Sequence, residues 1–173
     1  VTDTAFTLYE YCSLMQLNSD NSGRIYLYYL VHDAGGNYRI LHRRQSDDSG
    51  ASWGSASAFT LVYDPASAGK TPYFEFSSNG ADRIDITMQP TQIAAGVEMG
   101  VYHFYQHWDG SSTKYKKSDG TDITSGLPFS NTTNFTTVDS GVGYTSGIKN
   151  WGCFHNNGNP VSMYAAMMDN PIT

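Results

Sequence analysis

Apolar and polar residues alternate along most of this chain with the period of a β-strand. The stretch 23–32, GRIYLYYLVH, carries large apolar side chains at odd and even positions alike. This pattern predicts a strand that is buried on both faces. A second strand is expected over 37–45, after the segment DAGG, because glycine adopts the positive φ angles that tight hairpins require.

Turn-forming residues divide the rest of the chain into further strands. A single strand is expected over 57–64, and only 88–100 and 163–170 have a pattern that would suit short helices. The predicted hairpins are 71–88 with a turn at Asn79-Gly80, 100–120 with a turn at Asp109-Gly110, and 152–169 with a turn through 156–158. Strands that recur every roughly 8–14 residues indicate an all-β sandwich, barrel or propeller.

The spacing of the hairpins favours the propeller. The strands group into three modules, 9–63, 71–123 and 138–169, each near the blade length of about 45 residues. We therefore expect one β-propeller domain over 1–173. A closed propeller needs at least about four blades, so this domain is expected to be incomplete. Further blades of a longer chain, or other copies in a homo-oligomer, would cover the open edges.

One turn carries a specific motif. Residues 46–53 fit the pattern Ser-x-Asp-x-Gly-x-Ser-Trp through Ser46, Asp48, Gly50, Ser52 and Trp53. The carboxylate is expected to accept backbone N–H groups of its own loop, and the glycine to supply a conformation closed to other residues. The indole is expected to be buried between sheets. The motif therefore predicts a structural staple.

This motif resembles the Asp box of BNR repeats, found in sialidase-like propellers. The resemblance extends to the order of the segments in the BNR-repeat group that includes ulvan-type polysaccharide lyases. The segments that carry it are 11–29, 70–88, 100–123 and 151–165. It implies a propeller fold and a carbohydrate partner, with an acidic polysaccharide among the candidates.

The chain departs from that group's pattern at three places. Leu30 stands where the group tends to have Arg, Gln89-Pro90 replaces a His-Pro pair, and Tyr9-Glu10 stands where a His is common. A lyase needs a cation on the uronate carboxylate and a His or Tyr base. The departures therefore imply an incomplete catalytic set in this chain.

Composition and charge exclude several classes of partner. The formal net charge is −6, and basic residues form no long run, so no nucleic-acid partner is expected. No apolar run approaches the roughly 20 residues of a membrane span. Cys12 and Cys153 are too few for a four-thiolate metal site; they could pair as a disulfide or remain two buried thiols. No metal or cofactor is expected.

The best candidate for chemistry is the strand 101–108. Alternation places His103, Tyr105 and His107 on one face, where they could act as acid and base. The competing interpretation is a Tyr-rich strand whose histidines are merely hydrogen-bonded. Arg83 and Asp85 share a strand face and could pair. Candidate substrate-binding residues are Tyr102, Trp108, Arg83 and His155.

Three hypotheses for function follow. The first is an extracellular, virion or cell-surface module that binds or processes glycans. The second is a polysaccharide lyase or glycoside hydrolase whose remaining catalytic groups lie in other blades. The third is a structural subunit of a filament or tail fibre, in which open edge strands pair with copies.

Overall fold

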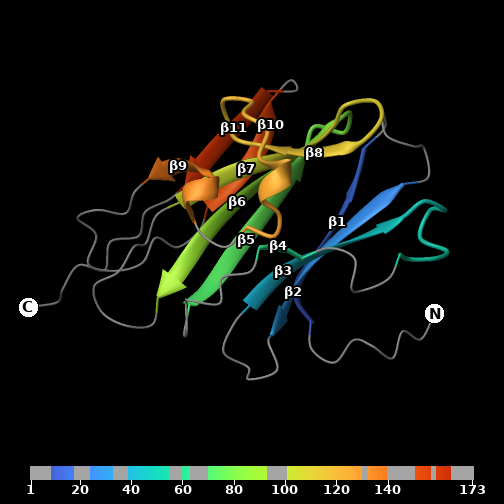
Figure 1. The fold of residues 1–173 in the computed structure, drawn as a ribbon, viewed down its shortest axis with the longest axis horizontal. Helices are drawn as coiled ribbons and strands as arrows, with labels where there is room; N and C mark the ends of the chain where they lie inside the picture. Colours follow the sequence, from blue (N-terminus) through green and yellow to red (C-terminus); the bar gives the residue numbers. More distant parts are fainter. Residues whose placement is uncertain are drawn as a thin grey trace, which may run out of the picture.

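A computed structural model of the chain describes residues 9–17, 24–32, 39–54, 60–62, 70–92, 101–129, 132–139, 151–156 and 159–164. Within these residues the fold is all-β, as the sequence predicts, and consists of two antiparallel sheets and a separate hairpin (Figure 1). Two 3-10 turns, η2 (Thr124–Gly126) and η3 (Thr132–Asn134), complete it.

The first sheet has the order β1-β2-β3-β4. Its strands are β1 (Tyr9–Gln16), β2 (Ile25–His32), β3 (Arg39–Ser46) and β4 (Thr60–Val62). The central pair β2 and β3 is regular over its full length, from Ile25 opposite Ser46 to His32 opposite Arg39. This regularity suits the predicted strand that is apolar on both faces.

The second sheet has the order β5-β6-β7-β8, with β9 also paired to β7. Its strands are β5 (Lys70–Ser78), β6 (Arg83–Gln92), β7 (Val101–Trp108), β8 (Thr113–Lys116) and β9 (Thr136–Asp139). Because β6 occupies one side of β7, β8 and β9 share the other side. β8 pairs with the second half of β7 and β9 with the first half.

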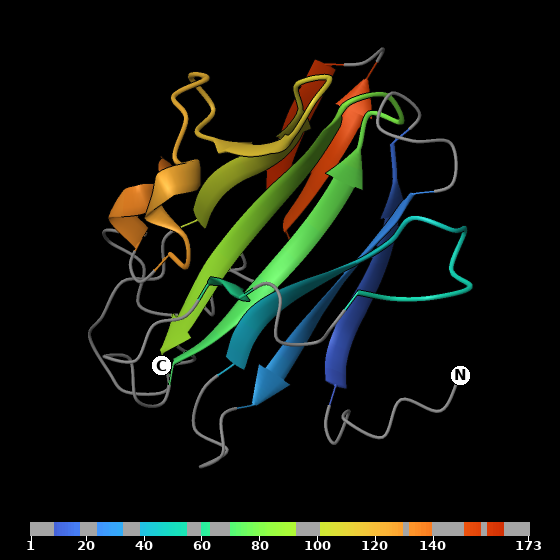
Figure 2. The same ribbon diagram turned by 45° about the vertical axis from the view of Figure 1, so that its right-hand side comes forward.

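The remaining hairpin consists of β10 (Trp151–Asn156) and β11 (Asn159–Tyr164). β10 lies close to β5 and β6 of the second sheet (Figure 2). The structure therefore contains three antiparallel units along the chain, in keeping with an all-β fold of partial blades. The exact blade limits stay a prediction.

Two details differ from the expected elements. Residues 88–92 belong to β6 instead of a short helix, because their backbone continues the register with β5 up to Lys70 opposite Gln92. Residues 138–139 belong to β9 and so join the second sheet, not the third module.

The side chains of Cys12 and Cys153 lie outside the described residues, so their pairing stays a prediction.

The core is formed mainly by large aromatic and aliphatic side chains. The Tyr28 ring stacks on Phe76 across the two sheets at 4.7 Å between centroids. Phe104 stacks on Phe135 at 4.5 Å and meets Phe129 edge-on. The fully buried side chains are Tyr26, Tyr28, Tyr29, Tyr115, Phe104, Phe129, Leu17, Leu30, Leu41, Ile84 and Ile86. Aromatic burial thus compensates for the low aliphatic content of the chain.

A buried amide joins the two sheets within this core. Gln106 Oε1 on β7 accepts hydrogen bonds from Tyr28 Oη at 2.7 Å, Arg43 Nη1 at 3.0 Å and Tyr115 Oη at 3.1 Å. Tyr28 and Arg43 belong to the first sheet, and Tyr115 belongs to the second. Burial raises the pKa of the Tyr115 hydroxyl to about 12, so it remains a donor at neutral pH.

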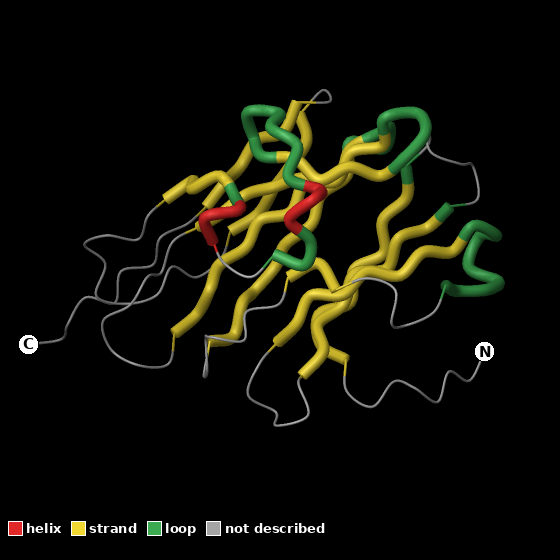
Figure 3. Tube along the Cα trace, viewed as in Figure 1, coloured by secondary structure: helices red, strands yellow, loops and turns green. Residues whose placement is uncertain are grey.

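The turn after β3 projects from the end of the first sheet (Figure 3). The hydrogen bonds expected at Asp48 are present: Oδ1 accepts from Ser46 Oγ at 2.7 Å and from the Ser52 backbone N–H at 2.8 Å, and Oδ2 accepts from Ser52 Oγ at 2.6 Å. Gly50 has φ +91°, which a side chain would strain. The carboxylate therefore fixes the turn from within.

Trp53 differs from its expected burial between sheets. The indole is partly exposed and lies outside the core cluster. Its ring lies near Gly50, on which a Cβ would lie 4.0 Å from the Trp53 ring and 3.8 Å from Ile25. Since the turn extends past Ile25, where β2 begins, the indole covers the glycine of its own loop instead of entering the core.

We expect Gln106→Leu to lower the free energy of unfolding by about 3 kcal/mol or more, because three buried donors lose an acceptor at a cost of about 1 kcal/mol or more each. Tyr28→Phe removes a single donor and should cost about 1 kcal/mol. Urea unfolding followed by tryptophan fluorescence measures both. Equal costs for the two variants would contradict the bridging role of Gln106.

We expect Asp48→Asn to lower the midpoint temperature at neutral pH. Hydrogen bonds from Ser52 and Ser46 lower the pKa of Asp48 to about 2, against its ordinary value of 3.8. A lowered pKa contributes stability above pH 3.8 that is lost as the pH falls towards 2. Thermal melts of both proteins across this range should therefore converge at the acid end. A difference that persists unchanged at pH 2 would contradict this.

Candidate functional site

The side of β6, β7 and β8 that faces away from the first sheet carries a cluster of polar side chains, of which Asp85, Thr87, His103 and Tyr105 are buried. Side chains alternate along a strand, and residues directly opposite each other in an antiparallel pair share a face. Arg83 on β6 lies opposite His107 on β7, which lies opposite Lys114 on β8. We call this side the polar face. Its members are Arg83, Asp85, Thr87, His103, Tyr105, His107, Lys114 and Lys116.

The opposite side of the same strands faces the core. Ile84 and Ile86 on β6 alternate with the polar-face residues and are fully buried with Phe104 of β7. The strands β6 and β7 therefore contribute to the core on one side and to the polar face on the other. Packing on one side fixes their register, and that register sets which polar groups meet on the other.

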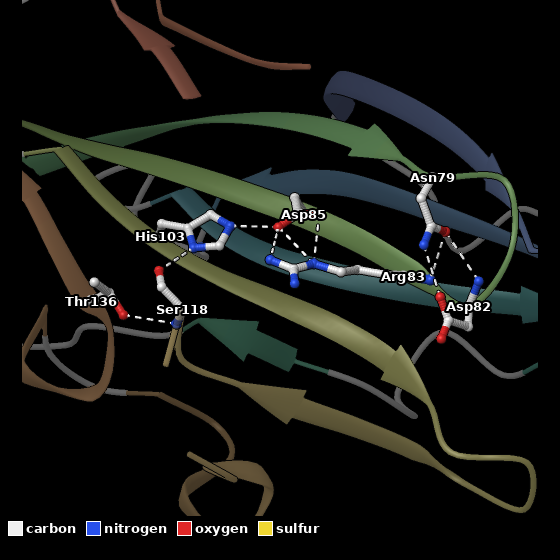
Figure 4. Close-up of polar contacts among 7 residues, drawn as sticks. All are labelled: Asn79, Asp82, Arg83, Asp85, His103, Ser118 and Thr136. Atoms are coloured by element: carbon white, nitrogen blue, oxygen red, sulfur yellow. Dashed lines mark hydrogen bonds and ion pairs between the residues drawn. The ribbon is translucent and has the colours of Figure 1, made fainter. Parts of the chain in front are cut away.

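A chain of hydrogen bonds runs across the polar face (Figure 4). His103 Nε2 lies 2.7 Å from Asp85 Oδ1, and His103 Nδ1 lies 2.6 Å from Ser118 Oγ. Arg83 binds the same carboxylate, with Nε 3.0 Å and 2.9 Å from its two oxygens and Nη2 2.6 Å from Oδ1. Asp85 is 0% exposed and His103 4%, whereas Ser118 is exposed.

The charge on Asp85 sets the tautomer of His103 when the imidazole is neutral. Burial alone would raise the pKa of Asp85, but hydrogen bonds from His103 and Arg83 outweigh burial and hold that pKa below its ordinary value. An ionised carboxylate only accepts hydrogen bonds. In the neutral form of His103, Nε2 therefore donates to Asp85, which leaves the lone pair of Nδ1 to accept from the Ser118 hydroxyl.

Tyr105 lies between this network and Lys116. The Arg83 guanidinium carbon is 3.6 Å from the centroid of the Tyr105 ring, a cation–π contact. Burial raises the pKa of the Tyr105 hydroxyl, against the opposing effect of the Arg83 charge, so the phenol is protonated at neutral pH. Its oxygen lies next to the turn that contains Ser118, because a Cβ on Gly120 would be 4.0 Å from it.

The hairpin before β6 fixes Arg83. Asn79 Oδ1 accepts from the backbone N–H groups of Ala81, Asp82 and Arg83 at 2.9 Å, 3.0 Å and 3.0 Å, and Gly80 has φ +72°. The predicted Asn79-Gly80 turn is therefore present. Asp82 lies 3.6 Å from His107 Nδ1 at the rim.

The structure brings some predicted site residues together and separates others. His103, Tyr105 and His107 share the polar face with Arg83, and the expected pairing of Arg83 with Asp85 is present. Tyr102 lies in the core on the opposite side. Trp108 also points away from the polar face and lies under the Arg24 guanidinium at 5.1 Å. The side chain of His155 lies outside the described residues.

Sequence reasoning missed the partner of Asp85 and the role of Ser118. His103 is 18 positions from Asp85 and 15 from Ser118. The register of β6 on β7 brings Asp85 and His103 together. The length of the segment that connects the two strands does not determine this register. The segment SDGT (118–121) marks a turn, but a turn signal does not show which strand the serine meets.

Other kinds of site find no support in the described parts of the chain. No group of three or more His, Cys, Asp or Glu side chains there could hold a metal ion. No helix there combines the length and the apolar character needed to cross a membrane.

The comparisons with known proteins show the fold. No family model and no curated protein matches the chain. Two solved structures of an ulvan lyase, from a new polysaccharide lyase family PL25, resemble it. One is bound to -[GlcA(1-4)Rha3S]- and has a TM-score of 0.63 at 15% identity; the other has a TM-score of 0.62 at 14%. The match covers 88% of this chain but 36% of each lyase chain.

This likeness supports a fold like that of polysaccharide lyases. Identity of this level carries no site residues across, so the roles of the polar-face residues depend on their own geometry. Membership of the Asp-box sialidase family stays a prediction.

We expect Asp85→Asn to lower the free energy of unfolding by about 3 kcal/mol at pH 7, because the Arg83 charge would stay partly buried without its carboxylate. Since the pKa of Asp85 is lowered on folding, its contribution is complete above the ordinary value of 3.8 and declines as the pH falls below it. Denaturant unfolding at several pH values measures this. Asp82→Asn, at the exposed rim, is the matched control and should cost less than about 1 kcal/mol.

Proposed function

We propose that this chain is part of an extracellular or cell-surface module that holds a polysaccharide across the polar face. The observation that carries the proposal is the convergence of imidazole, phenol and ammonium groups on adjacent strands. Tyr105, His107, Lys114 and Lys116 lie beside a buried ion pair that fixes the surface on which they stand. Sugars are recognised by such fixed polar groups next to aromatic rings.

Within this face, the lysines are the groups suited to an acidic sugar. The Arg83 guanidinium already binds Asp85 and lies over Tyr105, so it positions the site instead of meeting the ligand. Hydrogen bonds from Thr124 lower the pKa of the exposed Asp122 carboxyl, and the nearby charges of Lys114 and Lys116 add to this effect. Neither lysine makes a side-chain hydrogen bond within the described residues. A carboxylate or sulfate on the glycan would give them a charge-assisted partner.

The structural neighbours support a glycan as the partner. Both are ulvan lyases, and one was solved with a sugar that contains glucuronic acid and a sulfated rhamnose. The present chain spans 36% of their length. We therefore propose that further blades, on the same polypeptide or on another copy, complete the surface that holds the polymer.

A polysaccharide lyase is the second candidate, and one observation favours it. The protonated Tyr105 hydroxyl has no hydrogen-bond partner among the described residues, and His107 follows on the same face with about a quarter of its side chain exposed. His107 would remove the proton next to a uronate carboxylate, and Tyr105 would protonate the leaving sugar oxygen. His103 is less suited to the base, because both its ring nitrogens are engaged.

We expect the double variant Lys114→Ala/Lys116→Ala to weaken binding of an acidic polysaccharide by about tenfold or more, because charge-assisted hydrogen bonds are lost. Affinity electrophoresis through gels with an acidic or a neutral polysaccharide measures this. Lys117→Ala is the matched control: it is the next residue along, and its ammonium group already donates to the Thr133 carbonyl at 3.2 Å.

The outcomes separate the candidates. Equal retardation of the double variant and the native chain would refute binding at the polar face. A loss of retardation in Lys117→Ala as large as that in the double variant would also refute it. Ultraviolet absorbance from an unsaturated sugar product, recorded with the same polymer in solution, would establish the lyase. Retardation without such absorbance would leave binding as the function.

A further inference from the structure

The polar face contains an arrangement that polysaccharide binding does not need. From the solvent inwards, the Ser118 hydroxyl meets His103 Nδ1 at 2.6 Å, and His103 Nε2 meets the buried Asp85 carboxylate at 2.7 Å (Figure 4). A hydroxyl on an exposed residue, a base within hydrogen-bond reach and a third group that orients the base are the parts of an activated nucleophile.

We propose that Ser118, His103 and Asp85 form a Ser-His-Asp triad that hydrolyses acyl esters, with Ser118 as the nucleophile. This activity goes beyond the proposed glycan binding. It does not depend on that binding, because a small ester can reach an exposed serine directly. An acyl group carried by a bound polysaccharide would be the corresponding macromolecular substrate.

The proton arrangement required of a triad follows from the contacts. In the neutral form of His103, ionised Asp85 fixes the proton on Nε2, so Nδ1 faces Ser118 as a lone pair that can accept its proton. In the most familiar triads the two ring nitrogens are exchanged, but a triad is defined by geometry and roles. Arg83 holds the carboxylate in one orientation through three contacts of 3.0 Å or less.

The turn that carries Ser118 is held without help from its hydroxyl. The Lys117 N–H donates to the Thr121 carbonyl and the Gly120 N–H to the Lys117 carbonyl, both at 2.9 Å. The Ser118 N–H donates to Thr136 Oγ1 at 2.9 Å, and Gly120 has φ +89°. The Ser118 hydroxyl is thus not needed to fix the loop, and its position is set in advance.

A donor for the oxyanion lies next to the same turn. The Ser118 backbone N–H is already bound to Thr136, so it does not serve this purpose. The protonated Tyr105 hydroxyl lies beside Gly120 and has no hydrogen-bond partner among the described residues. It can donate to the negative charge that develops on the carbonyl oxygen of the ester.

The reaction balances without a cofactor. Ser118 Oγ bonds to the ester carbonyl carbon while its proton passes to His103 Nδ1, and the carbonyl electron pair moves onto oxygen. The ester C–O bond then breaks, and the leaving alcohol takes the proton from His103. Water attacks the acyl-serine with His103 again as the base, which releases the carboxylic acid and restores Ser118.

The test combines covalent labelling and turnover on the full chain. A fluorophosphonate probe is expected to label Ser118, as identified by peptide mass spectrometry, and p-nitrophenyl acetate to be hydrolysed. Ser118→Ala should abolish the labelling and lower hydrolysis by about a thousandfold. Ser111→Ala is the matched control and should change neither, because Ser111 is an exposed turn serine bound to Asp109 without a histidine.

A third variant separates catalysis from a structural role. Tyr105→Phe should lower ester hydrolysis by about a hundredfold through loss of the oxyanion donor, while the probe still labels Ser118. Thermal melts confirm that each variant is folded. Labelling of Ser118 no greater than that of Ser111, or unchanged hydrolysis in folded Ser118→Ala, would overturn the triad. Neither result would bear on the proposed polysaccharide binding, which is measured separately by the retardation of the protein in gels.

Discussion

The full burial of the Asp85 carboxylate is the constraint on which the polar face depends. A buried charge is tolerated only when it is paired and hydrogen-bonded, and Asp85 meets this requirement through Arg83 on its own strand and His103 on the next. Arg83 and His103 are each held in place by their contact with Asp85. Together they set the orientation of the groups around them. Tyr105 lies under the Arg83 guanidinium, and the Ser118 hydroxyl lies within hydrogen-bond distance of His103 Nδ1.

The opposite side of the same two strands explains why that arrangement is rigid. Ile84, Ile86 and Phe104 are fully buried there, and Gln106 joins the second sheet to Tyr28 and Arg43 of the first. A slip of β7 by one residue would turn the apolar side chains outwards and carry His103 into the core. The packing of the core therefore protects the register on which the Asp85–His103 contact rests.

The turns of this fold share one device, an Asp or Asn side chain that accepts the N–H groups of its own loop. Asp48, Asn79 and Asp109 all act in this way. At Asp109, backbone hydrogen bonds from Ser112 and Ser111 hold the pKa of the carboxyl well below its ordinary range. Such local acceptors let a glycine- and serine-rich chain form tight connections without large side chains. These local hydrogen bonds also explain why the motif at 46–53 has a structural role.

The sequence by itself determined most of the strands, their hairpin turns and the division of side chains between two faces, because these depend on neighbours one to four positions away. It therefore placed His103, Tyr105 and His107 together and predicted the contact between Arg83 and Asp85. It did not predict β9 or the end of β6. Only the tertiary structure decided that Asp85 meets His103, that His103 meets Ser118, and that Trp53 stays at the surface. Those outcomes depend on strand register and on where a turn ends relative to a sheet, which are set by packing between residues far apart in the chain.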